Sequence, residues 1–339
     1  MSAFRDSINI LKHLTLRRFW NLIQLKLSYW LSKYSKSNRI FGQPFSLSIE
    51  PTTACNLGCP ECPSGLKQFT RPTGKLQLDL HEKMLSQLSR TVFYINYYFQ
   101  GEPFLHPQFL DLIRAAKKHK IYTATSTNAH FISATKALEI VDSGLDRLII
   151  SVDGLTQATY EQYRVNGKLE KVLEASRYLV EAKKKRNSPT PHFIFQFLAV
   201  KPNEHEIPQI FEVAKEMGID EVRIKTAQLY DYENGHPLLP ENEKYSRYVL
   251  QKNGKYKLKG DPGNYCWRMW SGSVLTWDGK VVPCCFDKDA QHVLGSITDK
   301  SFDEIWKSPA YMNFRLAVLR NRKAIDICSN CSEGTKVWA

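Results

Sequence analysis

Three cysteines, Cys55, Cys59 and Cys62, stand close together in the segment CNLGCPEC. Thiolates bind iron–sulfur clusters, and a cubane 4Fe–4S cluster has four irons that need ligands. Three cysteines serve three irons and leave the fourth open, as in a catalytic metal site rather than a closed structural one. A zinc site would normally have a fourth Cys or His nearby, but the next histidine, His81, is too far along the chain. The spacing therefore favours an open cluster that binds a cofactor or substrate.

The C-x3-C-x2-C spacing, the flanking Asn56, Leu57 and Pro60, and the strand-like run before them resemble the radical SAM enzymes. The resemblance implies a partial barrel of six strand–helix units, with the cluster loop after the first strand. In that family S-adenosylmethionine chelates the open iron through its amino and carboxylate groups. The reduced cluster passes one electron to the sulfonium, which releases methionine and a 5′-deoxyadenosyl radical that abstracts hydrogen from a substrate. An electron donor of the flavodoxin or ferredoxin type is implied.

A second segment that carries the resemblance is Gln100-Gly101-Glu102-Pro103. It resembles the family's Gly-Gly-Glu-Pro motif, whose backbone and acid hold the amino group of S-adenosylmethionine, with Gln100 in place of the first glycine. A backbone carbonyl and a carboxylate can both accept hydrogen bonds from an ammonium group. The alternative is a plain turn between a strand and a helix.

Further candidates for cofactor contacts stand at the ends of later predicted strands. Thr127 and Asn128 suit ribose or carboxylate contacts, but they suit a helix cap equally well. By the resemblance, Ser151 and Asp153 lie near the adenosine sugar or the substrate. Arg164 resembles a basic residue that pairs with the methionine carboxylate, and a solvated arginine is the alternative.

The remaining five cysteines gather near the C-terminus, where Cys284 and Cys285 follow a predicted hairpin and two others form a C-x-x-C pair. The pattern resembles the SPASM/Twitch domains of radical SAM enzymes, which carry auxiliary 4Fe–4S clusters. Four ligands suffice for one closed cluster, and the expected set is Cys266, Cys284, Cys328 and Cys331. Cys285 in place of Cys284 is an alternative. So is a structural zinc ribbon, since four thiolates also hold zinc.

These residues need a scaffold, and short β-branched or aromatic runs alternate with amphipathic stretches from residue 45 to about residue 228. Such alternation predicts parallel strands joined by helices, that is, an α/β partial (β/α)6 TIM-like barrel followed by a small Fe–S domain with a β-hairpin. Sites in such barrels gather at the carboxyl ends of the strands. The expected strands are 45–50, 92–98, 121–126, 147–152, 192–199 and 221–226, and the expected helices are 79–90, 107–119, 133–143, 168–186 and 207–217.

The N-terminal segment is basic and amphipathic. Residues 4–34 predict one or two helices, and the chain up to Arg39 carries eight Lys or Arg against the single acid Asp6, a net +7 of the total +13. One interpretation is a helix packed across the barrel with solvated charges outside; the other is contact with a membrane surface or a partner. Charges interrupt every apolar run before about 20 residues, so a spanning helix is not expected.

The composition limits the class of protein, its cellular location and its partners. Of its 339 residues 42% are hydrophobic and 24% charged, which is ordinary for a globular chain. The clustered cysteines and the absence of an export signal predict a cytoplasmic location, with peripheral contact at the inner membrane surface as an option. No basic stripe with a recognition fold is evident, so nucleic acid is not an expected partner. The expected division is an extension 1–44, a barrel 45–235, and a linker with the auxiliary-cluster domain 236–339.

The combined pattern leads to a functional hypothesis. Hydrogen abstraction from a carbon that bears OH or NH2, followed by loss of a proton and an electron to the auxiliary cluster, completes a two-electron oxidation. The substrate could be a small molecule such as a sugar or cyclitol, a peptide, or a lipid-linked precursor. One alternative is a peptide maturase that forms a crosslink or thioether. The other is a non-enzymatic Fe–S redox or scaffold protein.

Overall fold

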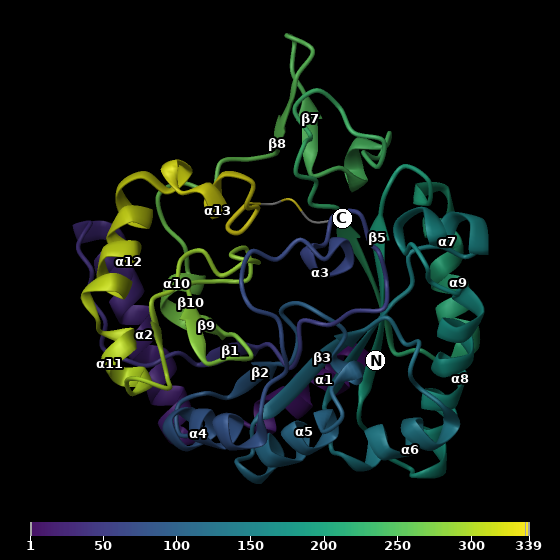
Figure 1. The fold of residues 1–339 in the computed structure, drawn as a ribbon, viewed down its shortest axis with the longest axis horizontal. Coiled ribbons are helices and arrows are strands. Elements are labelled where there is room, and N and C mark those ends of the chain that lie inside the picture. The colour runs from purple at the N-terminus through teal and green to yellow at the C-terminus, as the bar shows by residue number, and fades with distance from the viewer. Residues whose placement is uncertain (1, 336, 338–339) are drawn as a thin grey trace.

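A curved nine-stranded sheet dominates the computed structural model, which describes residues 2–335 and 337. Its order is β11-β10-β9-β1-β2-β3-β4-β5-β6, and β1 to β6 are all parallel. The two outer strands, β11 and β6, do not pair with each other, so the barrel is open, as predicted (Figure 1). The parallel strands are β1 (Ser46–Ile49), β2 (Tyr94–Asn96), β3 (Tyr122–Thr127), β4 (Arg147–Ser151), β5 (His192–Ala199) and β6 (Glu221–Thr226).

Helices connect the parallel strands and cover the outside of the sheet (Figure 1). Gly144 and Gly218 follow two of them with φ of +77°, the left-handed conformation that glycine adopts at helix ends without strain. The predicted elements are confirmed with ends shifted by at most two residues, and β2 is shorter by two residues at each end. The helices are α3 (Pro63–Leu66), α4 (Leu78–Leu88), α5 (Phe109–Lys118), α6 (Ala134–Asp142), α7 (Gln157–Tyr163), α8 (Leu169–Lys185) and α9 (Ile207–Met217).

The C-terminal hairpin joins the barrel sheet. Strand β9 (Gly272–Leu275) runs parallel to β1, with Ser46 opposite Gly272 and Ile49 opposite Leu275. It pairs antiparallel with β10 (Lys280–Val282), so the predicted hairpin is confirmed. The rest comprises β7 (Tyr248–Leu250) and β8 (Tyr256–Leu258), which form a separate projecting pair, then α10 (Arg268–Ser271), β11 (Gly295–Ser296), α11 (Phe302–Trp306), α12 (Pro309–Asn321) and α13 (Asp326–Ser329).

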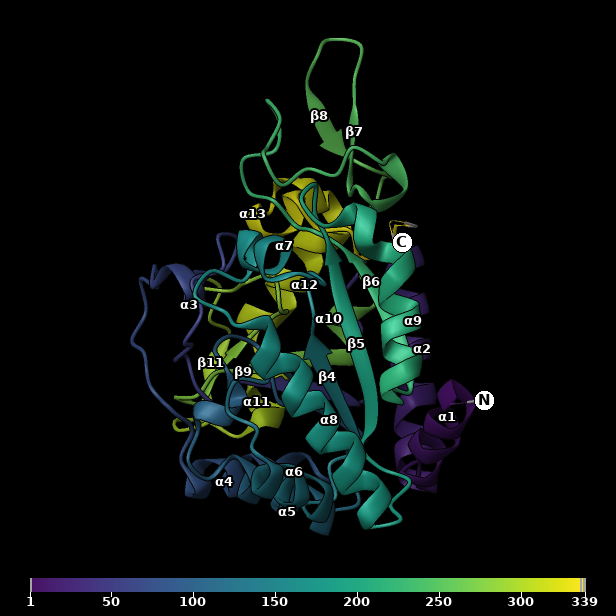
Figure 2. The same cartoon turned by 90° about the vertical axis from the view of Figure 1, so that its right-hand side faces the viewer.

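Two helices, α1 (Ser2–Lys12) and α2 (Leu16–Ser35), form the N-terminal segment. Buried Arg18 donates to the carbonyl oxygens of Ser89, His119 and Lys120, at 2.6–2.9 Å. These carbonyls lie just before β2 and β3, so the helices pack across the amino-terminal end of the barrel. In Figure 2 they lie on the opposite side of the strands from α3. None of the described helices combines the length and apolar character needed to span a bilayer.

Candidate active site

The loop with the three N-terminal cysteines follows β1, at the carboxyl end of the parallel strands. It folds back on itself: the amide of Cys62 donates to the carbonyl of Cys59 at 3.3 Å, and the amide of Gly58 donates to Val165 at 2.9 Å. A Cβ on Gly65 would lie 2.6 Å from the Cys59 nitrogen, so only glycine lets α3 pack this closely on the loop. The loop is therefore held by backbone contacts that leave its thiols available as ligands.

The donor set fits an iron–sulfur cluster. All eight cysteines are free thiols. Burial raises the pKa of Cys55 to about 11, so binding iron must displace its proton. The Arg164 Nη1 atom lies 3.8 Å from the Cys59 sulfur and the Asn128 Nδ2 atom 3.9 Å from the Cys55 sulfur, where N–H donors favour the thiolate form.

Among the described residues, no three His, Cys, Asp or Glu side chains converge on a point that could hold a single metal ion. The thiolates of a 4Fe–4S cluster each bind a different iron, and so they stand apart around the cube.

The Gly101 motif packs directly against the start of the cysteine loop. Gly101 has φ of +76°, and a Cβ there would lie 2.2 Å from the carbonyl oxygen of Thr52. The amide of Glu102 donates to Ala54 at 2.7 Å. Pro103 opens a short 3-10 helix that ends at Leu105. The segment therefore fixes the path of the chain that leads into Cys55.

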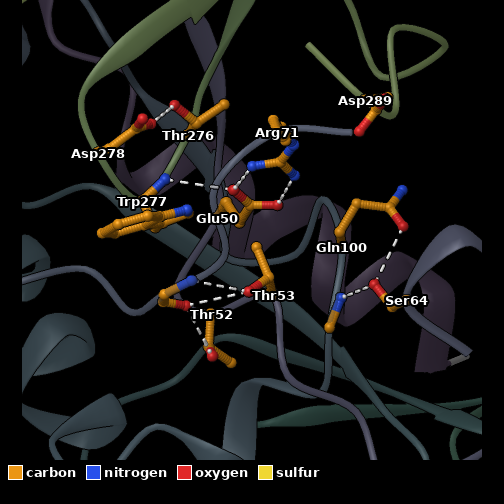
Figure 3. Close-up of polar contacts among 12 residues, drawn as sticks. Glu50, Thr52, Thr53, Ser64, Arg71, Gln100, Thr276, Trp277, Asp278 and Asp289 are labelled. Atoms are coloured by element: carbon orange, nitrogen blue, oxygen red, sulfur yellow. Dashed lines mark hydrogen bonds and ion pairs between the residues drawn. The ribbon is translucent and has the colours of Figure 1, made fainter. Parts of the chain in front are cut away.

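Gln100, which stands where the family motif has glycine, binds the far side of the loop. Its Oε1 accepts a hydrogen bond of 3.2 Å from the Ser64 hydroxyl, whose oxygen accepts one of 2.8 Å from the Gly101 amide (Figure 3). Gln100 therefore links the Gly101 motif to α3, which begins after Cys62.

Glu102, Thr127 and Asn128 form one buried polar group at the end of β3. The carboxylate of Glu102 accepts from the Thr127 hydroxyl and from the Asn128 amide, each at 2.7 Å. Burial raises the pKa of Glu102, against these donors. The Asn128 side chain in turn donates to Asn56 Oδ1 at 2.8 Å. The structure thus brings three of the candidate residues together and ties them to the cysteine loop.

Arg164 and Asp153 form a second buried polar pair. The Arg164 Nε atom donates to Asp153 Oδ2 at 2.5 Å, and the side chains are 16% and 1% exposed. The alternative of a solvated Arg164 is therefore wrong. Asp153 also accepts from the Leu198 amide at 2.7 Å. Ser151 is buried at the end of β4, two residues before Asp153.

The C-terminal cysteines come from three separate stretches of chain. Cys284 and Cys285 follow β10 and line a cavity of about 410 Å³, whose other walls include Ser48 of β1 and Asn96 of β2. Burial raises the pKa of Cys266 to about 11 and that of Cys328 to about 12. The cavity connects the inner side of the barrel with the C-terminal cysteine set.

Two guanidinium groups that the sequence analysis did not single out lie beside these thiols. Arg322 is 1% exposed, and its Nη2 lies 3.2 Å from the Cys331 sulfur. The Nη1 of Arg268 lies 3.9 Å from the Cys285 sulfur. Neither arginine belongs to a cysteine motif, so no local pattern marks them. The same holds for Glu50 and Arg71, which pair beneath the N-terminal loop (Figure 3).

Comparison with known proteins identifies both parts of the chain. A family model described as the radical SAM superfamily matches residues 49–214, and SPASM, an iron-sulfur cluster-binding domain, matches residues 266–332. A "tungsten-containing aldehyde ferredoxin oxidoreductase cofactor-modifying protein" of Pyrococcus furiosus is 26% identical, over 84% of this chain and 86% of its own. A PqqA peptide cyclase of Gluconobacter oxydans is 27% identical, over 80% of this chain and 79% of its own.

Solved structures share the fold. The complex of BtrN with AdoMet and 2-DOIA matches with a TM-score of 0.56 and 17% identity, over 88% of this chain and 98% of that one. Streptococcus suis SuiB bound to its precursor peptide SuiA gives 0.63 and 17%, over 89% and 72%. This chain belongs to the radical SAM superfamily: it is an enzyme whose barrel binds a 4Fe–4S cluster and S-adenosylmethionine and whose C-terminal SPASM domain binds an auxiliary iron–sulfur cluster.

Proposed function

We propose that this enzyme removes a hydrogen atom from a substrate carbon that bears OH or NH2 and completes a two-electron oxidation there. When bound, the open cluster with S-adenosylmethionine supplies the 5′-deoxyadenosyl radical, and the auxiliary cluster accepts the second electron. The proton lost in this oxidation passes to a base. Which base accepts it depends on where the substrate binds.

The observation that carries this proposal is the pairing of β1 with β9. The cysteine loop follows β1, and Cys284 follows the hairpin that begins with β9. The two strands are direct neighbours, but β10 runs back antiparallel, so Cys284 lies level with the start of β1 whereas the cysteine loop leaves the carboxyl end of β1. Ser48 of β1 and Cys284 line the same cavity, so the two cysteine sets lie toward opposite ends of one stretch of the barrel interior. A substrate held in that interior can then lie between the radical source and the electron acceptor.

We assign the ligands and cofactor contacts as follows. Cys55, Cys59 and Cys62 hold the open cluster, and the closed one is held by Cys266, Cys284, Cys328 and Cys331. Gly101 and Glu102 present the carbonyl and carboxylate for the ammonium of S-adenosylmethionine. The remaining contacts come from Pro103, Thr127, Asn128, Ser151, Asp153 and Arg164, of which Thr127 and Asn128 act mainly by orienting Glu102.

A peptide or protein side chain is the first candidate substrate. Support comes from the PqqA peptide cyclase and from SuiB, whose structure holds a precursor peptide. A cavity of about 700 Å³ lies against Cys55, and Lys67 and Lys75 in its wall would attract an acidic group. Formation of a crosslink within the peptide is the alternative outcome of the same hydrogen abstraction.

A sugar or cyclitol is the second candidate. BtrN, whose structure holds 2-DOIA, aligns over nearly its whole length with this chain. The C-terminal set here also has enough cysteines for one closed cluster, and one cluster suffices for a single two-electron oxidation.

We further propose the setting in which the reaction runs. A flavodoxin- or ferredoxin-type protein supplies the electron to the open cluster. The chain acts as three units, the extension 1–44, the barrel 45–235 and the auxiliary-cluster region 236–339. It works in the cytoplasm, where the extension makes a peripheral contact with the inner membrane. A lipid-linked precursor is the third candidate substrate.

The test begins with anaerobic reconstitution, iron counting and EPR spectroscopy with and without S-adenosylmethionine. We expect about eight irons in the parent and about four in the Cys55/Cys59/Cys62→Ala variant, with a cofactor-dependent spectrum in the parent alone. Peptides and polyols are then screened for 5′-deoxyadenosine release, and a hydrazide trap separates a new carbonyl from a crosslink, since both products have lost two hydrogens.

A matched pair of variants addresses the auxiliary site. Cys284→Ala should lower the iron content toward about four, whereas Cys285→Ala should keep about eight. Zinc retained in the C-terminal site of the parent, with about four irons in total, would overturn the oxidation step. Crosslinked product without a carbonyl would replace oxidation with peptide maturation.

A further inference from the structure

The face of α2 that packs on the barrel is mostly polar. Besides Leu25, its buried residues are Arg18, Asn21, Ser28 and Ser32. They are hydrogen-bonded: Asn21 donates to Gln43 at 2.8 Å, Ser28 accepts from the Phe41 amide at 2.8 Å, and Ser32 donates to Arg39 at 3.1 Å. Arg18 therefore joins α2 to strand connections of the barrel, and Asn21, Ser28 and Ser32 join it to residues 39–43, which follow the helix and lead into β1. Specific polar contacts thus fix the inward side of the helix, together with Leu25.

The opposite face of α2, here called the outer face, is apolar and exposed. At 100° per residue its members fall in one stripe, directly opposite the buried polar residues. Their exposed fractions run from 39% for Ile23 to 89% for Leu16. The outer face consists of Leu16, Phe19, Trp20, Ile23, Leu27, Trp30, Leu31 and Tyr34.

Helix α1 is oriented in the same way, with its polar side inward and its apolar side exposed. Its Asp6 is buried and bonds Tyr122 and Arg147, while Asn9 donates to Asp146 at 2.9 Å. Phe4, Ile8 and Leu11 point away and are 70%, 41% and 63% exposed. Two consecutive helices thus turn their polar sides inward and their apolar sides outward.

This arrangement needs an external partner. A helix on a globular protein normally buries its apolar stripe against the core, and large contiguous apolar surface marks a binding site. The polar faces already make hydrogen bonds within the protein. Rotating the helices to bury their apolar faces would break those bonds, so it would not stabilise the protein.

The charge around the outer face selects the partner. Up to Arg39 the only acid is Asp6, which is buried, so the exposed charges are all positive: Arg5, Lys12, Arg17, Lys26, Lys36 and Arg39, with Lys33 half-buried. A second copy would set two such cationic faces against each other, which is unfavourable. A bilayer with anionic headgroups offers both an apolar region for the outer face and negative charge for the surrounding cations. Trp20, Trp30 and Tyr34 are also of the residue types that favour the membrane interface.

We propose that α1 and α2 lie flat in the headgroup region of an anionic phospholipid bilayer, with the outer face of α2 inserted. The 20 residues of α2 give it a length of about 30 Å along the surface. Since both helices cover the amino-terminal end of the barrel, the cysteine loop at the carboxyl ends of the strands faces away from the bilayer (Figure 2). This deepens the membrane contact proposed above, and it favours a substrate that reaches the active site from water.

The test is cosedimentation of the reconstituted full chain with lipid vesicles. Vesicles with about one-third phosphatidylglycerol should bind the parent, and pure phosphatidylcholine should bind it far less. Trp20→Gln/Leu27→Gln/Trp30→Gln should weaken binding about a hundredfold. Lys12→Gln/Arg17→Gln/Arg39→Gln should weaken it about fivefold per charge, and added salt should do the same.

Matched controls alter equally exposed residues elsewhere. Phe211→Gln/Leu250→Gln/Val293→Gln removes apolar side chains that are 43–52% exposed, and Lys252→Gln/Lys255→Gln/Lys257→Gln removes exposed charges of the projecting β7–β8 pair; both should bind like the parent. Loss of binding in the controls, or a parent that ignores anionic vesicles, would overturn the proposal. So would a parent dimer that the outer-face variant converts to monomers. S-adenosylmethionine cleavage, measured on the same samples, reports separately on the proposed reaction.

Discussion

The guanidinium of Arg71 clamps the carboxylate of Glu50 with two hydrogen bonds, 2.8 Å from Nη1 to Oε2 and 2.5 Å from Nη2 to Oε1 (Figure 3). The side chains are 6% and 0% exposed. Glu50 directly follows β1, and Arg71 lies on the segment that returns from the cysteine loop. The same Glu50 Oε2 accepts from the amide of Trp277, at 3.3 Å, in the turn between β9 and β10. One buried ion pair therefore joins the first strand, the cysteine loop and the auxiliary hairpin.

Replacing one partner of this pair should be strongly destabilising. Arg71→Met leaves the Glu50 carboxylate buried without its counter-charge, which we expect to lower the free energy of unfolding by about 3–5 kcal/mol in urea titrations. Arg71→Lys should recover only part, because an ammonium cannot bond both oxygens in the same fork. The double variant Glu50→Gln/Arg71→Met should be more stable than Arg71→Met alone. A loss below about 1 kcal/mol in the single variant would contradict the clamp.

Gly101 offers a test of the cofactor site. Gly101→Ala would force a Cβ to 2.2 Å from the Thr52 carbonyl, so the chain before Cys55 must move. We expect S-adenosylmethionine binding to weaken at least about tenfold, by equilibrium dialysis on the reconstituted protein. Gly254→Ala is the control: Gly254 has a similar φ of +78° but open space around it. Equal losses in both variants would show that backbone strain alone is responsible.

The sequence was sufficient to predict the barrel and to group its candidate residues. Alternating strands and helices gave the topology because the parallel strands are short runs rich in β-branched or aromatic residues, as Phe193 and Phe195 in β5 illustrate, and amphipathic helices separate them. The carboxyl-end rule then placed Glu102 and Thr127 at one end of the sheet. Both inferences follow from the order of strands and helices along the chain, and neither requires knowledge of contacts between particular distant side chains.

Contacts across the fold could not be predicted. Nothing local in the sequence pairs β9 with β1, positions Arg322 beside Cys331, or directs the Gln100 side chain to Ser64. The inversion of α2 was also missed. Helical periodicity reveals two faces but not which one packs inward, and here buried Arg18 decides it by bonding carbonyls of two strand connections.

Acid should loosen the N-terminal helices. Asp146 accepts from Asn9, Lys117 and the Thr123 amide, and although burial opposes it, hydrogen bonds from His13 and Lys117 hold the pKa of Asp146 below its usual value. A depressed carboxyl pKa contributes stability that is present above the unfolded pKa of about 4 and is lost as pH falls through the folded pKa.

Asp146→Asn removes this contribution. We expect it to lower the free energy of unfolding by about 1–3 kcal/mol at neutral pH and to flatten the decline below about pH 4. Limited proteolysis within residues 2–35 at each pH measures the local effect. Asp142→Asn is the control, because the Asp142–Arg186 pair is exposed on both sides. An unchanged acid limb in Asp146→Asn would assign the pH dependence to other carboxylates.

Arg322 should tune the auxiliary cluster. Its guanidinium is buried, bonds the carbonyls of Tyr265 and Glu333 at 2.9 Å, and points at the Cys331 sulfur. A buried positive charge favours the reduced, more negative cluster, so Arg322→Gln should lower the reduction potential, on the order of tens of millivolts, in an EPR-monitored redox titration. Arg322→Lys keeps the charge and should lie closer to the parent.

The matched variant Arg268→Gln tests the same effect on the reduction potential at the Cys285 thiol. Arg268 lies near Cys285, whose neighbour Cys284 is the assigned ligand, so its removal should shift the potential less than that of Arg322. A larger shift from Arg268→Gln would instead indicate that Cys285 binds iron, because a charge acts most strongly on the ligand it contacts. Iron content measured on each variant separates a change in potential from a loss of the cluster.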